Sequence, residues 1–277
     1  MSIINYNAEQ ALLTIARGHP YDREAFAGLF EGLQEYNVSH VEQPVAQKLL
    51  SAQTANAFDA IVCYDMPGVD FTAQDDPPGL VEPDPEFVKN YLAMLEAGIG
   101  MVFMHHSLAA WPAWEQYAEI IGGRFHYRPA TLRGTQWPDS GYIHQITHTV
   151  SKVAEHPVLE GIPSSFEITD ELYLCPVFDE DVIPLLRSDY SYDDSNFYSA
   201  ARAIVGDMNV RDGWEHPQGS NLVGWVKRYG NSPIVYLQGG DDAVAMNNEH
   251  FQKLLHNAVR WVSSEAAHAW ARGEAEE

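Results

Sequence analysis

The sequence predicts one doubly wound α/β domain, and three observations lead to that prediction. The chain has 277 residues, enough to bury a sizeable core. Short apolar segments alternate with segments of helical periodicity through its first half. Each apolar segment ends in residues typical of turns. Because strand and helix alternate, parallel strands joined by crossover helices are expected.

The first half supplies four predicted strands, at residues 11–16, 38–41, 58–64 and 100–104. After the first strand, Asp22 can cap a helix whose apolar side chains keep helical spacing; these are Phe26, Leu29, Phe30 and Leu33. Further helices are predicted over residues 86–97 and 113–121, each followed by a glycine that can end it. The Pro-, Asp- and Gly-rich segment 69–85 is either an ordered rim of a site or a mobile lid.

The second half is less regular. Strands are predicted at residues 142–150, 182–186, 222–226 and 234–237, the last two forming a hairpin. One face of residues 249–262 is apolar, which predicts a closing helix. No linker divides the chain, so residues 1–265 are expected to form the domain and residues 266–277 a frayed acidic tail.

Composition excludes several functions. The formal net charge is −23, so we expect neither nucleic acid nor an anionic membrane as a partner. No apolar run approaches the roughly 20 residues that span a bilayer, and residues 1–6 lack the features of a signal peptide. Cys63 and Cys175 are too few for a four-cysteine zinc site or a disulfide framework. A cytoplasmic protein with free thiols is therefore expected.

The carboxyl ends of the predicted strands locate a site, because ligands bind there in open α/β sheets. Polar residues follow three strands at this edge: Arg17, His19, Tyr64, Asp65, His106 and Ser107. His106 is predicted to be the turn residue between strand and helix, where other folds carry a nucleophile. It is either a general base, a metal ligand or a histidine hydrogen-bonded at a helix start. Neither cysteine lies at such a turn, which argues against amidotransfer through a thioester.

Other candidates come from later segments. Of the adjacent carboxylates Asp170 and Glu171, only one can face a site from a strand. Asp241 follows the last strand and can reach the same edge, and His126 can line the pocket. His144 and His148 have the same strand parity; a solvated face is favoured over a paired metal site.

Several short motifs together resemble the trehalose-utilisation (ThuA-like) family. They are Arg17-Gly18-His19, the strand and histidines of residues 100–126 with Trp111-Pro112 and Gly122-Gly123-Arg124-Phe125-His126, His156-Pro157 with Gly161, Asp170-Glu171-Leu172-Tyr173, and Asn257-Ala258-Val259-Arg260-Trp261. They spread over nearly the whole chain in the family's order. The resemblance implies a fold of the flavodoxin-like or class I glutamine amidotransferase-like type, without the catalytic cysteine.

The resemblance also implies a role in sugar catabolism, since relatives accompany dehydrogenases that make 3-keto glycosides. One departure is that the family's Gly-His-Asp after the late strand has Gly240 in its middle position here. Residues 190–196, rich in Tyr and Asp, form an insertion that can reshape the substrate end.

The leading hypothesis is an enzyme that acts on a keto sugar or glycoside by hydrolysis, elimination or isomerisation. His106 would be the base, with His19 and either Glu171 or Asp241 as acid or orienting group. Trp111 and Tyr64 would stack on the sugar. A divalent metal such as zinc, held by His19, His106 and a carboxylate, is an alternative way to polarise the carbonyl. The rival hypothesis is a non-catalytic carbohydrate-binding or regulatory protein on the same scaffold, and either protein can be a homo-oligomer.

Overall fold

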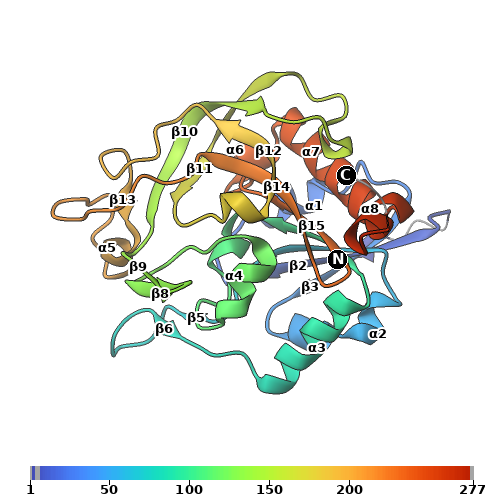
Figure 1. Ribbon diagram of the computed structural model, residues 1–277, viewed down its shortest axis with the longest axis horizontal. Helices are drawn as coiled ribbons and strands as arrows, with labels where there is room; N and C mark the ends of the chain where they lie inside the picture. The colour runs from blue at the N-terminus through green and yellow to red at the C-terminus, as the bar shows by residue number, and fades with distance from the viewer. Residues whose placement is uncertain (1, 4–6, 275–277) are drawn as a thin grey trace.

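A computed structural model describes residues 2–3 and 7–274 (Figure 1). One large sheet organises the fold, with the strand order β1-β3-β2-β4-β7-β15-β14-β12-β10-β11 and with β13 paired to β10. Pairing is parallel across five neighbouring strands: β3 (Tyr36–Glu42), β2 (Gln10–Arg17), β4 (Ala60–Asp65), β7 (Gly100–Met104) and β15 (Ser232–Leu237). These include the four strands predicted from the first half, so the predicted doubly wound α/β fold is confirmed.

The remaining strands of this sheet pair antiparallel to their neighbours: β1 (Ser2–Ile3), β14 (Leu222–Tyr229), β12 (Ile183–Ser188), β10 (Gly141–Lys152), β11 (Ser165–Leu174) and β13 (Tyr198–Ser199). The predicted hairpin is the β14–β15 pair. Two small hairpins lie outside the sheet: β5 (Val69–Asp70) with β6 (Gly79–Leu80), and β8 (Ala130–Leu132) with β9 (Thr135–Trp137).

Helices cover both faces of the sheet, as Figure 1 shows for α7 and α8 on one side and α2 and α3 on the other. The helices are α1 (Arg23–Gly28), α2 (Ala52–Ala55), α3 (Pro85–Glu96), α4 (Glu115–Ile121), α5 (Ala200–Ile204), α6 (Ala243–Met246), α7 (Glu249–Val262) and α8 (Glu265–Ala271). The predicted cap is confirmed, since the Asp22 carboxylate accepts hydrogen bonds from the backbone N–H groups of Glu24 and Ala25.

Two apolar cores result from the alternation of side chains along the strands. Leu12 of β2 lies in the core with α1 and α7, whereas the next residue, Leu13, lies in the core with α3 and α4. Because both faces of the central strands are covered, these strands are apolar throughout rather than alternating.

The predicted tail begins too early. Residues 265–271 form α8, Ser264 caps it, and Ala267 and Ala271 are buried. Five of its seven residues are Ala or Trp, and the small alanine side chains let this short helix pack against the rest of the fold. Residues 275–277 of the predicted tail lie outside the described residues.

Candidate functional site

The turn after β7 places a histidine at the carboxyl edge of the sheet, but that residue is His105. Residues His105–Ala109 form a single 3₁₀ turn, and His105 has the left-handed φ of 43°. A positive φ is uncommon for a non-glycine residue and is found at strand-to-helix turns that present a reactive side chain. The prediction that His106 is the turn residue was therefore wrong by one position.

Both ring nitrogens of His105 have partners, although the side chain is fully buried. Nδ1 lies 2.7 Å from the carbonyl oxygen of Gln238 and must donate to it. Nε2 lies 3.0 Å from Oε2 of Glu171 and 3.3 Å from Oδ1 of Asp241. The Tyr173 hydroxyl is 2.8 Å from the same nitrogen.

These contacts favour positive charge on the imidazole. Burial alone lowers the pKa of His105, but hydrogen bonds and charge from Asp241 and Glu171 outweigh it and raise that pKa well above 6.5. Burial also raises the pKa of Asp241, and the facing His105 and His144 reverse this and hold it far below its usual range. The cluster is thus a cationic centre between two carboxylates.

A β-bulge brings His144 to the same two carboxylates. The register of β10 against β11 shifts between Ile143 and Ile146, and Gln145 has φ +50°. Nδ1 of His144 lies 3.2 Å from Oε1 of Glu171 and 3.9 Å from Oδ2 of Asp241. Asp241 and Glu171 together raise the pKa of His144 above 6.5, against the opposing effect of burial.

The bulge also separates His144 from His148. With one extra residue in β10, His148 pairs with Ile168 and lies on the opposite face from His144. His148 is buried and its Nδ1 lies 2.9 Å from Ser188 Oγ. The expectation of a shared solvated face was therefore wrong, because strand parity holds only without a bulge.

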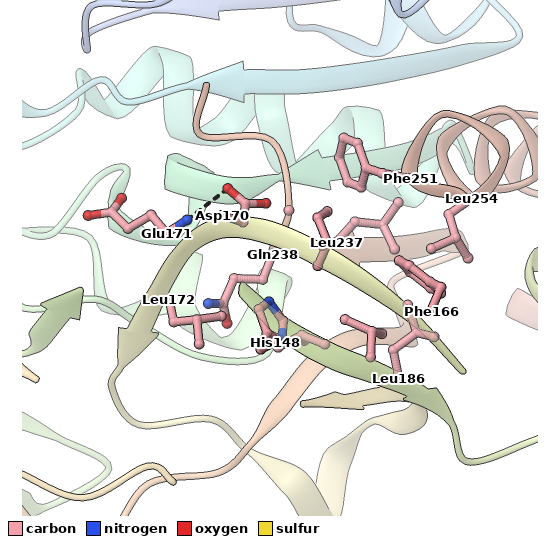
Figure 2. Close-up of a pocket in the computed structure, with 14 residues that line it drawn as sticks. His148, Phe166, Asp170, Glu171, Leu172, Leu186, Leu237, Gln238, Phe251 and Leu254 are labelled. Carbon is pink, nitrogen blue, oxygen red and sulfur yellow. Dashed lines mark hydrogen bonds between the residues drawn. The ribbon is translucent and has the colours of Figure 1, made fainter. Parts of the chain in front are cut away.

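Asp170 supports the site from behind. As predicted for neighbours on a strand, the two carboxylates point apart, as Figure 2 shows. Of the two, only Glu171 lines the larger cavity described below. Asp170 accepts hydrogen bonds from the backbone N–H groups of Gly240 (2.7 Å) and Asp241 (3.0 Å). Burial raises the pKa of Asp170 to about 7, against the opposing effects of His105 and these N–H groups. It therefore fixes the turn that carries Asp241.

Gly240 is required by this turn. Its φ is +105°, and a Cβ there would lie 3.1 Å from the ring of Phe251. A histidine in the position expected from related sequences would be strained in this backbone. In this protein the carboxylates that contact His105 are those of Glu171 and Asp241.

A cavity of about 200 Å³ opens onto Glu171 and His144. Its walls are mainly aromatic and apolar, and its lining residues include His19, Phe71, Phe125, Tyr127, Tyr142 and Tyr173. Phe71 belongs to segment 69–85, which the β5–β6 hairpin orders as a rim of the cavity. The volume and lining fit a small ligand with an apolar face.

Figure 2 shows a second, smaller cavity, which is lined by residues of β11, its neighbouring strands and α7. It measures about 30 Å³, is lined mostly by apolar side chains such as Leu237 and Phe251, and has room for water but not for a sugar.

The predicted convergence of His19 and His106 is present, beside the cluster. Their ring centroids lie 5.0 Å apart, and Tyr64 packs against His106 at 4.2 Å. His106 Nε2 lies 3.1 Å from the carbonyl oxygen of Tyr64 and donates to it, while burial lowers the pKa of this side chain well below 6.5. His106 is therefore a neutral, packed histidine, and its role as base or metal ligand stays a prediction.

Four further predicted site residues lie outside the cavity lining. Ser107 donates to the carbonyl of Cys63, and Trp111 packs on Phe87 in the core. His126 is buried, and Arg17 pairs with Glu42 at 3.6 Å. These four residues lie at the predicted places in the chain, but their side chains do not line the cavity.

Asp65 is likewise buried away from the cavity, and its carboxylate accepts a hydrogen bond of 2.5 Å from Gln43. Burial raises its pKa from 3.8 to about 7. Between pH 4 and pH 7, Asp65 therefore keeps its proton in the folded protein, whereas it has lost that proton in the unfolded chain. The free energy of unfolding therefore falls as pH rises from about 4 to about 7, and this effect is constant above.

We expect Asp65→Asn to remove this loss, because the amide keeps an acceptor for Gln43 without a charge. The difference in the free energy of unfolding between the variant and the wild type should shift by about 3 kcal/mol in favour of the variant from pH 5 to pH 8. Urea unfolding at each pH measures it. If the free energy of unfolding of the two proteins changed with pH in the same way, Asp65 would already be ionised in the folded protein at pH 5, which contradicts the prediction.

Together, the fold and the site define a class: a doubly wound α/β protein with a buried histidine at the turn that follows β7. The chain belongs to the ThuA family, described as trehalose utilisation, which it matches over residues 15–262. The resemblance inferred from the motifs is thereby confirmed.

Solved structures agree on the fold. A putative ThuA-like protein from Bacteroides uniformis ATCC 8492 is 18% identical with a TM-score of 0.62, covering 92% of this chain and 91% of its own. One from Parabacteroides merdae ATCC 43184 is 16% identical with a TM-score of 0.61 over 92% and 90%. Cytoplasmic protein STM3548 from Salmonella typhimurium is 13% identical with a TM-score of 0.54 over 91% and 98%. A search of the curated proteins finds no match. Within residues 2–3 and 7–274, no helix is long and apolar enough to cross a membrane.

Sequence reasoning gave His105 and Tyr173 no role of their own in the candidate site, and for His144 it favoured a solvated face over a metal site. His105 directly follows the apolar strand, so its position was a signal for the turn. His144 depended on a bulge that the sequence does not announce.

Proposed function

We propose that this protein is an enzyme that acts on a keto sugar or keto glycoside by moving a proton next to the carbonyl group. One observation carries the proposal: an aromatic-walled cavity lined by His144, whose imidazole is held by the carboxylate of Glu171. A base oriented by a carboxylate is a common arrangement for proton transfer.

His144 has the geometry of the base. Its Nδ1–H donates toward Glu171, which leaves the lone pair of Nε2 for the substrate. The hydrogen on the carbon beside a keto group is acidic. When Nε2 takes that proton, the C–H electron pair moves to the carbonyl oxygen and forms an enediolate.

The protonated His144 then completes the reaction in one of two ways. It can donate the proton to a glycosidic oxygen on the next carbon as that C–O bond breaks, which is elimination. It can instead deliver the proton to the former carbonyl carbon, while the hydroxyl proton of the adjacent carbon passes to the enediolate oxygen. The keto group then moves by one carbon, which is isomerisation. Both routes balance without an external oxidant, because the keto group is already present in the substrate.

The structure gives amidotransfer no nucleophile among its described residues. Cys63 and Cys175 are both buried, and burial raises the pKa of each thiol, so neither forms a thiolate at the cavity. The family's description as trehalose utilisation supports a carbohydrate substrate. We place the activity in the cytoplasm, since free thiols persist there.

The test is incubation of the purified protein with 3-keto glycosides in D₂O, with the parent glycosides as controls. We expect deuterium at the carbon beside the keto group and a changed product, both followed by NMR. The parent glycosides, which lack the acidifying carbonyl, should not exchange. Calorimetric binding of a keto glycoside without exchange or turnover would select the non-catalytic carbohydrate-binding function instead.

A further inference from the structure

Three donor atoms from distant parts of the chain meet beside the cavity, and Glu171 is the one of the three residues that lines it. They are Nε2 of His105, from the turn after β7, and the carboxylates of Glu171 on β11 and Asp241 after β15. Each residue offers one ligand atom, and these atoms all lie within 4.8 Å of one another. We propose that His105, Glu171 and Asp241 bind a divalent transition-metal ion, of the kind represented by zinc and manganese.

The hydrogen bond of His105 to Gln238 selects the tautomer that a metal ligand needs. The carbonyl oxygen of Gln238, 2.7 Å away, can only accept, so Nδ1 carries the proton. In the neutral imidazole the lone pair is then on Nε2. A histidine ligand with its other N–H on a backbone carbonyl is the usual arrangement at protein metal sites.

Metal binding would displace the Nε2 proton of His105. The freed lone pair then faces two carboxylate oxygens, so that three electron-rich atoms surround the position of one cation. The distances from Nε2, 3.0 Å to Glu171 and 3.3 Å to Asp241, suit a shared ion. Ligand atoms about 2.1 Å from a tetrahedral ion lie about 3.4 Å from one another. A proton can neutralise only one of these contacts at a time, whereas a metal ion binds all three atoms.

The surrounding residues hold the three ligands in place. Asp170 binds the backbone of Gly240 and Asp241, and the Tyr236 hydroxyl donates to the carbonyl oxygen of His105 at 2.9 Å. Glu171 turns Oε2 toward His105 and Oε1 toward His144. One carboxylate can thus bind the metal ion and still orient His144.

The donor set indicates the kind of metal. One imidazole with two carboxylates suits zinc, manganese or iron(II), whereas calcium and magnesium prefer oxygen ligands alone. Three protein ligands leave a position for water or substrate, as in catalytic sites. The ion would lie beside Glu171, which lines the cavity, and could polarise a carbonyl oxygen there.

The experiment measures metal binding without any substrate, so its result is independent of the proposed sugar reaction. Protein without a histidine tag is stripped with EDTA, and Zn²⁺ and Mn²⁺ are titrated in separately by calorimetry. Bound metal is counted by elemental analysis after dialysis. We expect one equivalent of one of these ions per chain.

Three variants locate the site. Glu171→Gln and Asp241→Asn should each weaken binding by more than about 100-fold, beyond the 10–100-fold typical of outer-shell changes. Glu167→Gln, four residues earlier on β11 with an exposed side chain, is the matched control and should bind like the wild type. Circular dichroism melting shows whether each variant is folded.

The proposal is overturned if the wild type takes up neither ion stoichiometrically, or if folded Glu171→Gln and Asp241→Asn both retain wild-type affinity. It is also overturned if His19→Gln abolishes binding while Glu171→Gln keeps it. That result would move the ion to the neighbouring pair His19 and His106.

Discussion

His144→Gln is expected to lower kcat on a keto glycoside by about 10²- to 10⁴-fold, the usual contribution of a positioned general base. Glutamine can keep a hydrogen bond to Glu171 but cannot take a proton at neutral pH. The imidazole is 44% exposed, and its polar contacts are to Glu171 and Asp241. The melting temperature should therefore change little, and deuterium exchange at the substrate carbon should be lost together with turnover.

The matched control is His250→Gln on α7. That side chain is 32% exposed, comparable to His144, and packs on Phe166 away from the cavity. It should leave kcat and exchange at wild-type values. If His144→Gln retained full turnover while His106→Gln abolished it, the base would be the residue that sequence reasoning favoured.

Gly100→Ala is expected to lower the free energy of unfolding by about 3 kcal/mol or more. A Cβ at this position would lie 2.1 Å from the carbonyl oxygen of Val262, at the end of α7. The backbone of residue 100 belongs to β7 and the carbonyl group of Val262 belongs to α7, so neither can move without shifting α7 away from β7. Since β7 leads directly into His105, the shift should also reduce activity.

Urea unfolding of Gly100→Ala and Gly28→Ala separates this clash from the general effect of adding a methyl group. Gly28 ends α1, and no heavy atom lies within 4 Å of its Cβ position. Alanine there should raise the free energy of unfolding by up to about 1 kcal/mol. Equal stability of Gly100→Ala and the wild type would mean that α7 does not pack as closely on β7 as the structure shows.

Local sequence patterns predicted the elements that depend on local interactions. The strand before His105 is a continuous apolar run, and α7 was predicted with the observed bounds because one of its faces is apolar. The polar residues after the parallel strands predicted a site at this edge of the sheet, and the candidate cluster of His105, Glu171 and Asp241 lies there. His19 and His106 lie together there, as expected from the strand order alone.

Only the tertiary structure decided which side chains at that edge face one another. A bulge in β10 turned His144 toward Glu171 and His148 away, and the left-handed φ at His105 moved the turn by one residue. Gly240 adopts a positive φ in the turn after β15, and its backbone N–H donates to the Asp170 carboxylate, which holds that turn in place. One extra or missing residue in a strand moves every later side chain of that strand to the opposite face of the sheet. The class of fold is therefore evident from the sequence pattern, whereas the chemistry of the site depends on a few backbone angles that the pattern does not specify.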